Sequence, residues 1–176
     1  MTWKKLREKT FKLSHKKIVR KTFRLPDGKE ADFDIHQEGE IVTLLALTKD
    51  HRTILTRQFR PGPEKIFLEL PGGRIDPGET PWHAAARELM EETGYKGRLI
   101  SLGATHDRAY SNLVRHNFLA VDCVKAGEQD LDETEFIEVV LMGMKQFRGC
   151  LRQGKLKGIE TAYLGLDRLG SLGRNK

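Results

Sequence analysis

Three glutamates lie close together in the middle of the chain, at spacings that could bring their carboxylates to one site. Glu88, Glu91 and Glu92 are three and four residues apart, so on a helix they would share one face. Neighbouring carboxylates repel one another, and a bound divalent cation would relieve that repulsion. Oxygen donors without flanking Cys or His ligands favour magnesium or manganese. A solvated acidic helix face is the alternative that this spacing leaves open.

The helix that must carry these glutamates has boundary signals at both ends. Thr80 is a good N-cap, Pro81 suits the first helical position, and Gly94 suits a left-handed stop. We therefore predict a helix over residues 81–93. Its other face is expected to pack, because at helical spacing it carries Trp82, Ala85, Ala86, Leu89 and Thr93.

The residues on both sides of the glutamates extend this pattern well beyond a single helix. Its fixed positions are Gly73, Glu79, Arg87, Glu88, Leu89, Glu91, Glu92, Gly94 and Tyr95. This arrangement resembles the Nudix box, the signature of the Nudix hydrolases. Tyr95 is its one departure, because a bulky aliphatic residue is more usual at that place.

The resemblance implies a fold of the α/β (α+β) class, a Nudix-like α/β/α sandwich with a mixed sheet and an N-terminal β-hairpin. In agreement, residues 18–24 and 30–37 are strand-like and a Pro-Asp-Gly turn separates them. We expect N-terminal strands in residues 1–40, a catalytic domain in 41–170 and a tail in 171–176. Further strands are expected at 41–48, 53–60, 67–70, 98–105, 114–124 and 136–144, with helices at 145–152 and 158–169.

The resemblance also assigns roles within the box. Glu88 and Glu92 are the first choice as ligands of Mg (or Mn), and Glu91 would bridge to a further ion or act on a metal-bound water. The backbone carbonyl of Gly72 would be an additional metal ligand. Glu79 and Arg87 would form an ion pair that fixes the carboxylates in place.

The general base is expected in an acidic loop after the box, as in several Nudix enzymes that cleave ADP-ribose. Residues 127–135 read GEQDLDETE and contain Glu133 and Glu135. We favour Glu133 over Glu135 by a narrow margin. Solvated loop acids without a catalytic role are the alternative.

Features outside the box resemble the branch that cleaves ADP-sugars. The run R-Q-F-R-P-G begins at Arg57 and includes Arg60, and we expect both arginines to project from one strand face toward an anion. Arg74 and Tyr110 are further candidates for substrate binding. Tyr110 stands where that branch often has a proline, so it bears on which sugar is accepted.

The resemblance implies Mg-dependent hydrolysis of the pyrophosphate bond of a nucleoside diphosphate linked to another moiety. ADP-ribose, cleaved to AMP and ribose 5-phosphate, is the favoured small-molecule substrate. Nucleoside triphosphates, dinucleoside polyphosphates or capped RNA 5′ ends are the alternative substrates. A module that binds a nucleotide without turnover is disfavoured, because the box glutamates are intact.

The charge distribution gives one hint about other partners. Residues 1–24 hold 10 Lys and Arg against one acid, and residues 145–176 hold 8 against two, within a net charge of +6. Such basic ends could meet nucleic acid or a polyphosphate. A solvated Lys-rich N-terminus is the simpler explanation, which leaves nucleic acid as a less favoured partner.

Length and hydropathy are typical of one globular domain. The chain has 176 residues, of which 38% are hydrophobic, and its mean hydropathy is -0.52. No apolar run approaches the roughly 18 residues of a membrane helix, and no apolar segment follows the Lys-rich start. We expect a cytoplasmic protein without a membrane partner. The resemblance further implies a homodimer whose N-terminal strands, over residues 18–37, cross to the partner.

Overall fold

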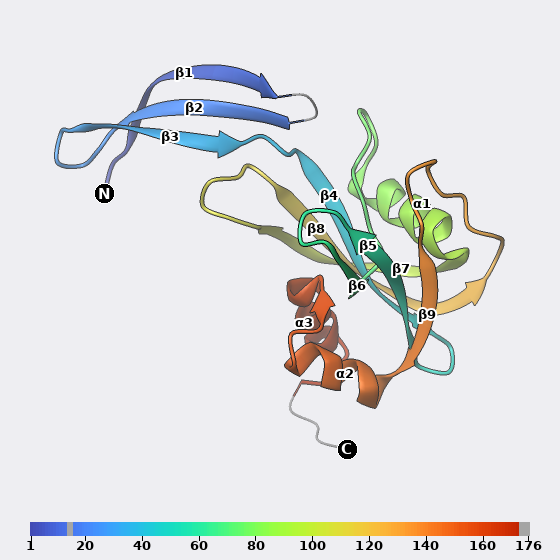
Figure 1. Cartoon of the computed structure of the whole chain (residues 1–176). Coiled ribbons are helices and arrows are strands. Elements are labelled where there is room, and N and C mark those ends of the chain that lie inside the picture. The colour runs from blue at the N-terminus through green and yellow to red at the C-terminus, as the bar shows by residue number, and fades with distance from the viewer. Residues whose placement is uncertain (14–15, 173–176) are drawn as a thin grey trace. The chain divides into compact units, whose positions relative to one another are not determined.

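The computed structural model describes residues 1–13 and 16–172 of the chain (Figure 1). Contacts divide the chain into two compact units. The first contains residues 1–40 and 105–115, and the second contains residues 41–104 and those from 116 onward. Residues 173–176, most of the predicted tail 171–176, lie outside the described residues.

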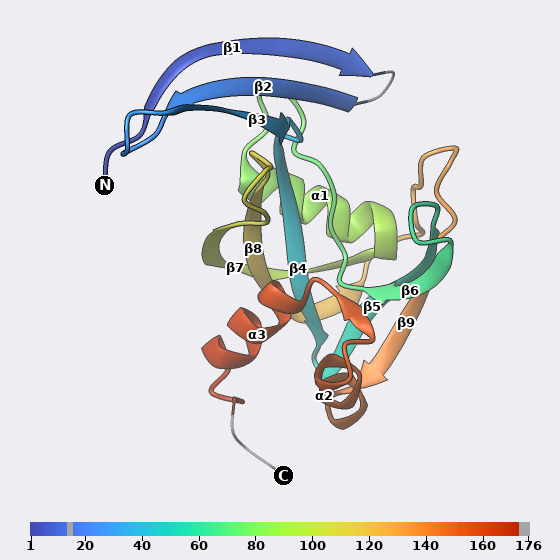
Figure 2. The ribbon, with the colours of Figure 1, turned by 60° about the vertical axis from the view of Figure 1, so that its left-hand side comes forward.

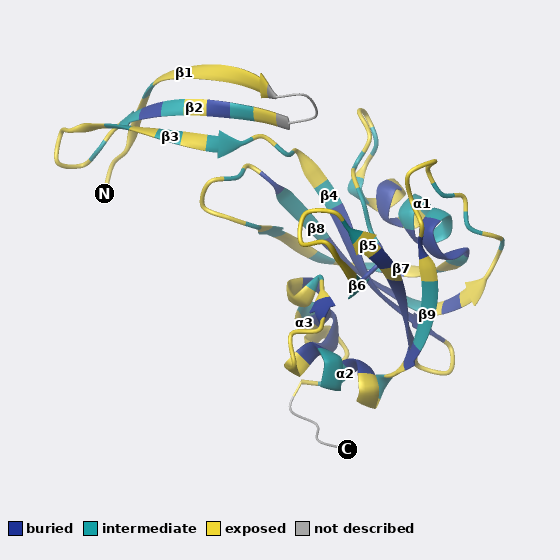
Figure 3. Cartoon of the chain, viewed as in Figure 1, coloured by how far each residue is buried: buried dark blue, intermediate teal, exposed yellow. Residues whose placement is uncertain are grey.

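The first unit is built on an antiparallel sheet in the order β1-β2-β3. Its strands are β1 (Lys4–Leu13), β2 (Lys16–Arg24) and β3 (Glu30–His36). The predicted hairpin is therefore present as β2 and β3, but it is part of a larger sheet. The sequence does not predict β1, because lysines and arginines occupy both of its faces and it is exposed along almost all of its described length (Figure 3).

Aromatic side chains form the apolar part of the first unit. The ring centroids of Trp3, Phe23 and Phe33 lie 5.9 to 6.1 Å apart. Tyr110 stacks on Phe33 at 6.2 Å. These four residues help to line a cavity of about 410 Å³.

The second sheet has seven strands in the order β10-β6-β5-β4-β8-β7, with β9 pairing with β5. β10 runs parallel to β6, whereas β4, β6 and β9 run antiparallel to β5, so the sheet is mixed as predicted. The strands are β4 (Glu40–Thr48), β5 (Arg52–Arg60), β6 (Lys65–Glu69), β7 (Tyr95–His106), β8 (Val114–Lys125), β9 (Glu138–Gly143) and β10 (Leu156–Lys157).

Helices cover both faces of this sheet. The helices of the described residues are α1 (Pro81–Thr93), α2 (Met144–Arg152) and α3 (Ile159–Arg168). Figure 2 shows α1 on one face and α2 with α3 on the other. This arrangement confirms the predicted α/β/α sandwich. None of these helices combines the length and the apolar character that a membrane span requires.

The central strand β4 explains why two helical layers form. Its side chains alternate between two apolar cores, as a strand buried on both faces must do. Val42, Leu44 and Ala46 enter the core that contains α1, and Leu45 and Leu47 enter the other core. The helices contribute Ala84, Ala85 and Leu89 to the first core, and Phe147, Leu151, Ala162 and Leu166 to the second.

Candidate active site

The glutamate-bearing helix α1 begins and ends at the predicted residues. The hydroxyl of Thr80 accepts a hydrogen bond from the His83 N–H at 3.2 Å. Gly94 has φ 70° and its N–H donates to the Met90 carbonyl at 2.7 Å, which ends the helix in the left-handed conformation. Because both ends are fixed locally, the spacing of the glutamates is set by the helix itself.

The face that α1 buries agrees with the predicted one at Ala85, Leu89 and Thr93 and differs from it elsewhere. Trp82 is 48% exposed, and Ala86 is exposed as well. Ala84 and Glu92 are buried, at 0% and 4% exposure. The buried face is thus rotated toward the acidic side, because the loop before the helix packs against that side. The glutamates are consequently not a solvated surface stripe.

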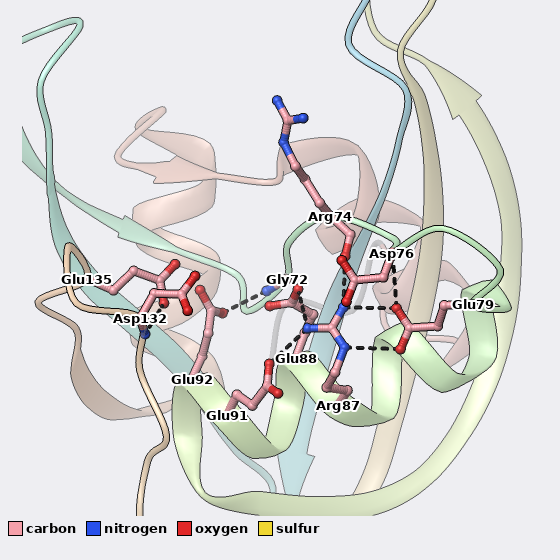
Figure 4. A network of polar contacts seen from close by, with 10 residues as sticks. All are labelled: Gly72, Arg74, Asp76, Glu79, Arg87, Glu88, Glu91, Glu92, Asp132 and Glu135. Atoms are coloured by element: carbon pink, nitrogen blue, oxygen red, sulfur yellow. Dashed lines mark hydrogen bonds and ion pairs between the residues drawn. The ribbon is translucent and has the colours of Figure 1, made fainter. Parts of the chain in front are cut away.

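Arg87 lies at the centre of a network of carboxylates (Figure 4). Its guanidinium donates two hydrogen bonds of 3.0 Å to Glu79, one of 3.0 Å to Glu88 and one of 2.8 Å to Glu91. A further bond of 2.9 Å reaches the Arg74 carbonyl. The predicted pair of Glu79 and Arg87 is therefore present. It raises the pKa of Arg87 and lowers that of Glu79 through the hydrogen bonds between them.

Two glycines lie against the Glu92 and Glu88 carboxylates. The Gly72 N–H donates to a Glu92 carboxylate oxygen at 2.8 Å. Gly72 has φ 150°, and a Cβ there would lie 2.2 Å from the Val42 carbonyl oxygen. A Cβ on Gly73 would lie 2.4 Å from a Glu88 carboxylate oxygen. The Glu88 carboxylate therefore takes the space that any larger residue at position 73 would need.

Burial makes two of these carboxylates reluctant to ionise. It raises the pKa of Glu88 to about 7, although Arg87 opposes the change. It raises the pKa of Glu92 to about 8, although the Gly72 N–H opposes it. Negative charge on Glu135 adds to both increases. A cation at this place would favour the ionised forms.

The carboxylates open onto a cavity of about 770 Å³ in the second unit. Its lining has seven acidic side chains and three arginines, an excess of negative charge that would repel a pyrophosphate. Bound cations would weaken this repulsion. The charged lining residues are Asp76, Glu88, Glu91, Glu92, Asp130, Asp132, Glu135, Arg60, Arg74 and Arg87.

The donor set fits a hard divalent cation in its chemistry. Within the described part of the chain, no group of three or more His, Cys, Asp or Glu side chains is gathered closely enough to hold an ion. The contacts explain this, since Arg87 holds Glu88 and Glu91 while the Gly72 N–H holds Glu92. The glutamates would have to exchange some of these bonds for bonds to metal.

The acidic loop supplies Glu135 to the cavity rather than Glu133. Glu133 and Glu135 are both exposed, but Glu135 lines the cavity together with Asp130 and Asp132, whereas Glu133 is not among the lining residues. The Asp132 N–H donates to a Glu135 carboxylate oxygen at 3.3 Å. A tight turn at residues 132–135 places Glu135 at the edge of the cavity, and the choice of base between the two glutamates stays a prediction.

The expectation that Arg57 and Arg60 share one strand face is wrong. The two residues are three positions apart, and a strand places such residues on opposite faces. Arg57 donates to Glu138 at 3.0 Å, outside the cavity. Arg60 lines the cavity and donates to both carboxylate oxygens of the buried Glu69, at 2.9 and 2.7 Å. Glu69 raises the pKa of Arg60 and holds its guanidinium in place.

The other two candidates for substrate binding lie in different units. Arg74 lines the cavity, and in Figure 4 its side chain extends away from the carboxylates. Tyr110 belongs to the aromatic cluster of the first unit, so its role in binding stays a prediction. Sequence reasoning missed Glu69, Asp76, Asp130 and Asp132, although the acidic loop and the E-L-P-G-G run contained the signal for three of them.

Comparison with known proteins places this geometry in a family. The NUDIX domain profile matches residues 38–161. The chain belongs to the Nudix family. It is 32% identical over 142 residues to an ADP-ribose pyrophosphatase of Bacillus subtilis (strain 168), which covers 79% of this chain and 77% of that protein. It is therefore a Nudix hydrolase similar to the ADP-ribose pyrophosphatases.

Two further comparisons bear on the fold and on the range of relatives of this Nudix hydrolase. The chain is 27% identical over 142 residues to a methanol dehydrogenase activator of Bacillus methanolicus, covering 78% of this chain and 76% of that protein. A crystal structure of an ADP compounds hydrolase matches with a TM-score of 0.84 at 22% identity, over 99% of this chain and 97% of that one. This second likeness establishes the Nudix fold.

The raised carboxylate pKa values predict how the stability of the metal-free protein depends on pH. Between about 4.5 and about 8 the folded protein holds more protons on Glu88 and Glu92 than the unfolded chain does. The free energy of unfolding should therefore fall as the pH rises through this window. Each unit between the folded and unfolded pKa corresponds to about 1.4 kcal/mol. Urea unfolding in EDTA at pH 5, 6.5 and 8 measures the decline.

The control for this experiment is Glu92→Gln, which removes the more strongly perturbed carboxylate. Its stability should fall less between pH 5 and pH 8, and added Mg²⁺ at pH 8 should stabilise it less than the wild type. The same decline in both proteins would show that Glu92 does not cause it.

Proposed function

We propose that this protein hydrolyses the pyrophosphate bond of a nucleoside diphosphate linked to another moiety, with ADP-ribose as the favoured substrate. One observation carries the proposal: Glu88, Glu91 and Glu92 of α1 and Glu135 of a distant loop line a single cavity together with three arginines. The similarity to an ADP-ribose pyrophosphatase supports the choice of substrate.

Magnesium or manganese would be held by Glu88, Glu91 and Glu92 with the carbonyl of Gly72. Bound there, the cation would neutralise the phosphate oxygens and lower the pKa of water. Arg87 keeps Glu88 and Glu91 together before a cation arrives, through its bonds to both carboxylates. Glu79 in turn holds Arg87, so the α1 carboxylates depend on a residue of the preceding loop.

Glu135 would act as the general base. It accepts a proton from the attacking water while the water oxygen forms a bond to one phosphorus atom of the pyrophosphate. The bond from that phosphorus to the bridging oxygen breaks, and its electron pair stays with the departing phosphate. Arg60 and Arg74 bind phosphate oxygens, where the negative charge of the leaving group develops. From ADP-ribose the products are AMP and ribose 5-phosphate.

The substrate is tested by incubating the protein and Mg²⁺ with a panel of nucleotides and identifying the products by mass. The panel contains ADP-ribose, other nucleoside diphosphate sugars, nucleoside triphosphates, dinucleoside polyphosphates and capped RNA. The highest kcat/KM is expected for ADP-ribose. Faster hydrolysis of capped RNA 5′ ends or of a nucleoside triphosphate than of ADP-ribose would favour the alternative substrates. Binding of ADP-ribose without turnover would show a module that only senses the nucleotide.

The choice of base is tested by substituting two glutamates of the same loop. Glu135→Gln should lower kcat by about 10²- to 10⁴-fold, the range of general-base contributions, because the acceptor for the proton of water is lost. Glu133→Gln is the matched control and should change kcat less than about twofold, since Glu133 does not line the cavity. The opposite order of effects would restore Glu133 as the base.

We also propose that the protein is a homodimer in which the N-terminal strands, over residues 18–37, take part. Large apolar side chains are exposed in both units, among them Trp3 at 49%, Phe59 at 55% and Phe136 at 81%. Association would cover such surface. Light scattering should give twice the chain mass of 20.1 kDa, and the mass of a single chain would contradict the dimer.

A further inference from the structure

The loop that carries Glu135 begins beside the C-terminal end of α1. After β8, the N–H groups of Ala126 and Gly127 donate to the Gly94 carbonyl at 2.8 and 3.2 Å. The Asp130 N–H donates to the Glu91 carbonyl at 2.9 Å. The last carbonyls of a helix have no partner within the helix, so they are available to hold this segment.

The side chain of Gln129 adds a connection of a different kind. Its Nε2 donates to the Glu92 carbonyl at 2.6 Å and to the Ile137 carbonyl at 3.2 Å. Glu92 is the second-last residue of α1, and Ile137 lies directly before β9. One half-buried amide group therefore joins the end of the helix to the far end of the loop.

These two attachment points lie next to the reacting groups. Glu92 carries one of the cavity carboxylates, and Ile137 follows Glu135 by two residues. The hydrogen bonds that the structure describes for residues 131–136 are internal to the loop, from the Glu135 N–H to the Asp132 carbonyl and from the Asp132 N–H to Glu135. They shape the turn but do not fix it against the helix.

We propose that Gln129 is a positioning residue that holds Glu135 at a set distance from the carboxylates of α1. This inference rests on the proposed role of Glu135 as the base. The Nε2 group of Gln129 donates to both carbonyls. A displacement of either carbonyl therefore shifts the other through this one side chain. Gln129 itself does not line the cavity and touches no reacting atom.

The test compares Gln129→Met with Lys125→Met. Methionine keeps the length of glutamine and removes its donors. Lys125 is the matched control, because its Nζ donates to the Thr93 carbonyl at 3.2 Å, at the same helix end, without a bond to the loop. Gln129→Met should lower kcat about 10- to 100-fold and leave KM within about twofold, as removing a supporting hydrogen bond does. Lys125→Met should change both less than about twofold.

A double-mutant cycle separates positioning from general destabilisation. In a Glu135→Gln background, Gln129→Met should cost less than about twofold in kcat, because the group that it positions is already absent. Gln129→Lys keeps a donor for one carbonyl and should therefore lower kcat by an intermediate amount. This variant replaces Gln129→Met in the experiment if the methionine variant does not fold. If Gln129→Met lowered kcat as much in the Glu135→Gln background as in the wild type, the inference would be overturned.

Backbone hydrogen exchange provides a readout that does not depend on activity. The hydrogen-bonded amides of Asp132 and Glu135 should exchange about tenfold faster in Gln129→Met than in the wild type. Their exchange rates should be unchanged in Lys125→Met. If the wild type cleaves no nucleoside diphosphate compound, the proposed function fails, while the exchange rates still decide whether Gln129 holds the loop. Unchanged exchange in Gln129→Met would overturn the inference.

Discussion

The free energy of placing carboxylates side by side in a partly buried cavity is the constraint on which the rest of this site depends. Desolvation alone would drive Glu88 and Glu92 toward their neutral forms. Arg87 offsets part of this desolvation free energy, because its planar guanidinium donates to Glu79, Glu88 and Glu91 at the same time. A lysine could not make these contacts together. The arrangement keeps the carboxylates close while leaving negative charge for a cation to neutralise.

The backbone before α1 is shaped by the same constraint. Gly72 turns an N–H toward Glu92, and Gly73 leaves the volume that the Glu88 carboxylate fills. Neither position accepts a side chain without moving a carboxylate or the β4 backbone. The two glycines thus allow close packing, of Gly72 against the β4 backbone and of Gly73 against the Glu88 carboxylate. A loop, a helix and a buried strand are fitted together around two carboxylates.

The parts of this fold that local signals determine could be predicted from the sequence. Thr80, Pro81 and Gly94 fix the ends of α1 through bonds within a few residues, and the apolar run of β4 identifies a strand buried on both faces. The strand β1 could not be predicted in this way. Its stability comes from pairing with β2, and its own sequence is dominated by exposed cations.

The site residues also divide into those that local spacing predicts and those that depend on contacts between distant segments. The box fixes which glutamates share a helix face, since that follows from a spacing of three and four residues. It does not determine which loop acid lines the cavity, or that Glu69 of β6 holds Arg60 of β5. Both facts depend on contacts between segments that are distant in sequence or on the register of strands. The partner of Arg57 was missed for the same reason, because Glu138 lies on β9, 81 residues away.

The positions of the site residues indicate that bond cleavage and substrate selection depend on different groups. Relatives of similar overall likeness have names as different as a pyrophosphatase and a dehydrogenase activator, so the shared fold leaves room for different roles. In the proposed reaction the box residues act on the pyrophosphate group, which all the candidate substrates contain. Discrimination must then come from groups that contact the remainder of the ligand. In the second unit an apolar hollow adjoins the cavity and offers such groups. Leu131 and Glu135 line both the cavity and the hollow, and Phe59 and Phe136 line the hollow alone. The loop that carries the proposed base therefore lines both hollows, and in the proposed complex it would also contact the ligand beyond its phosphates.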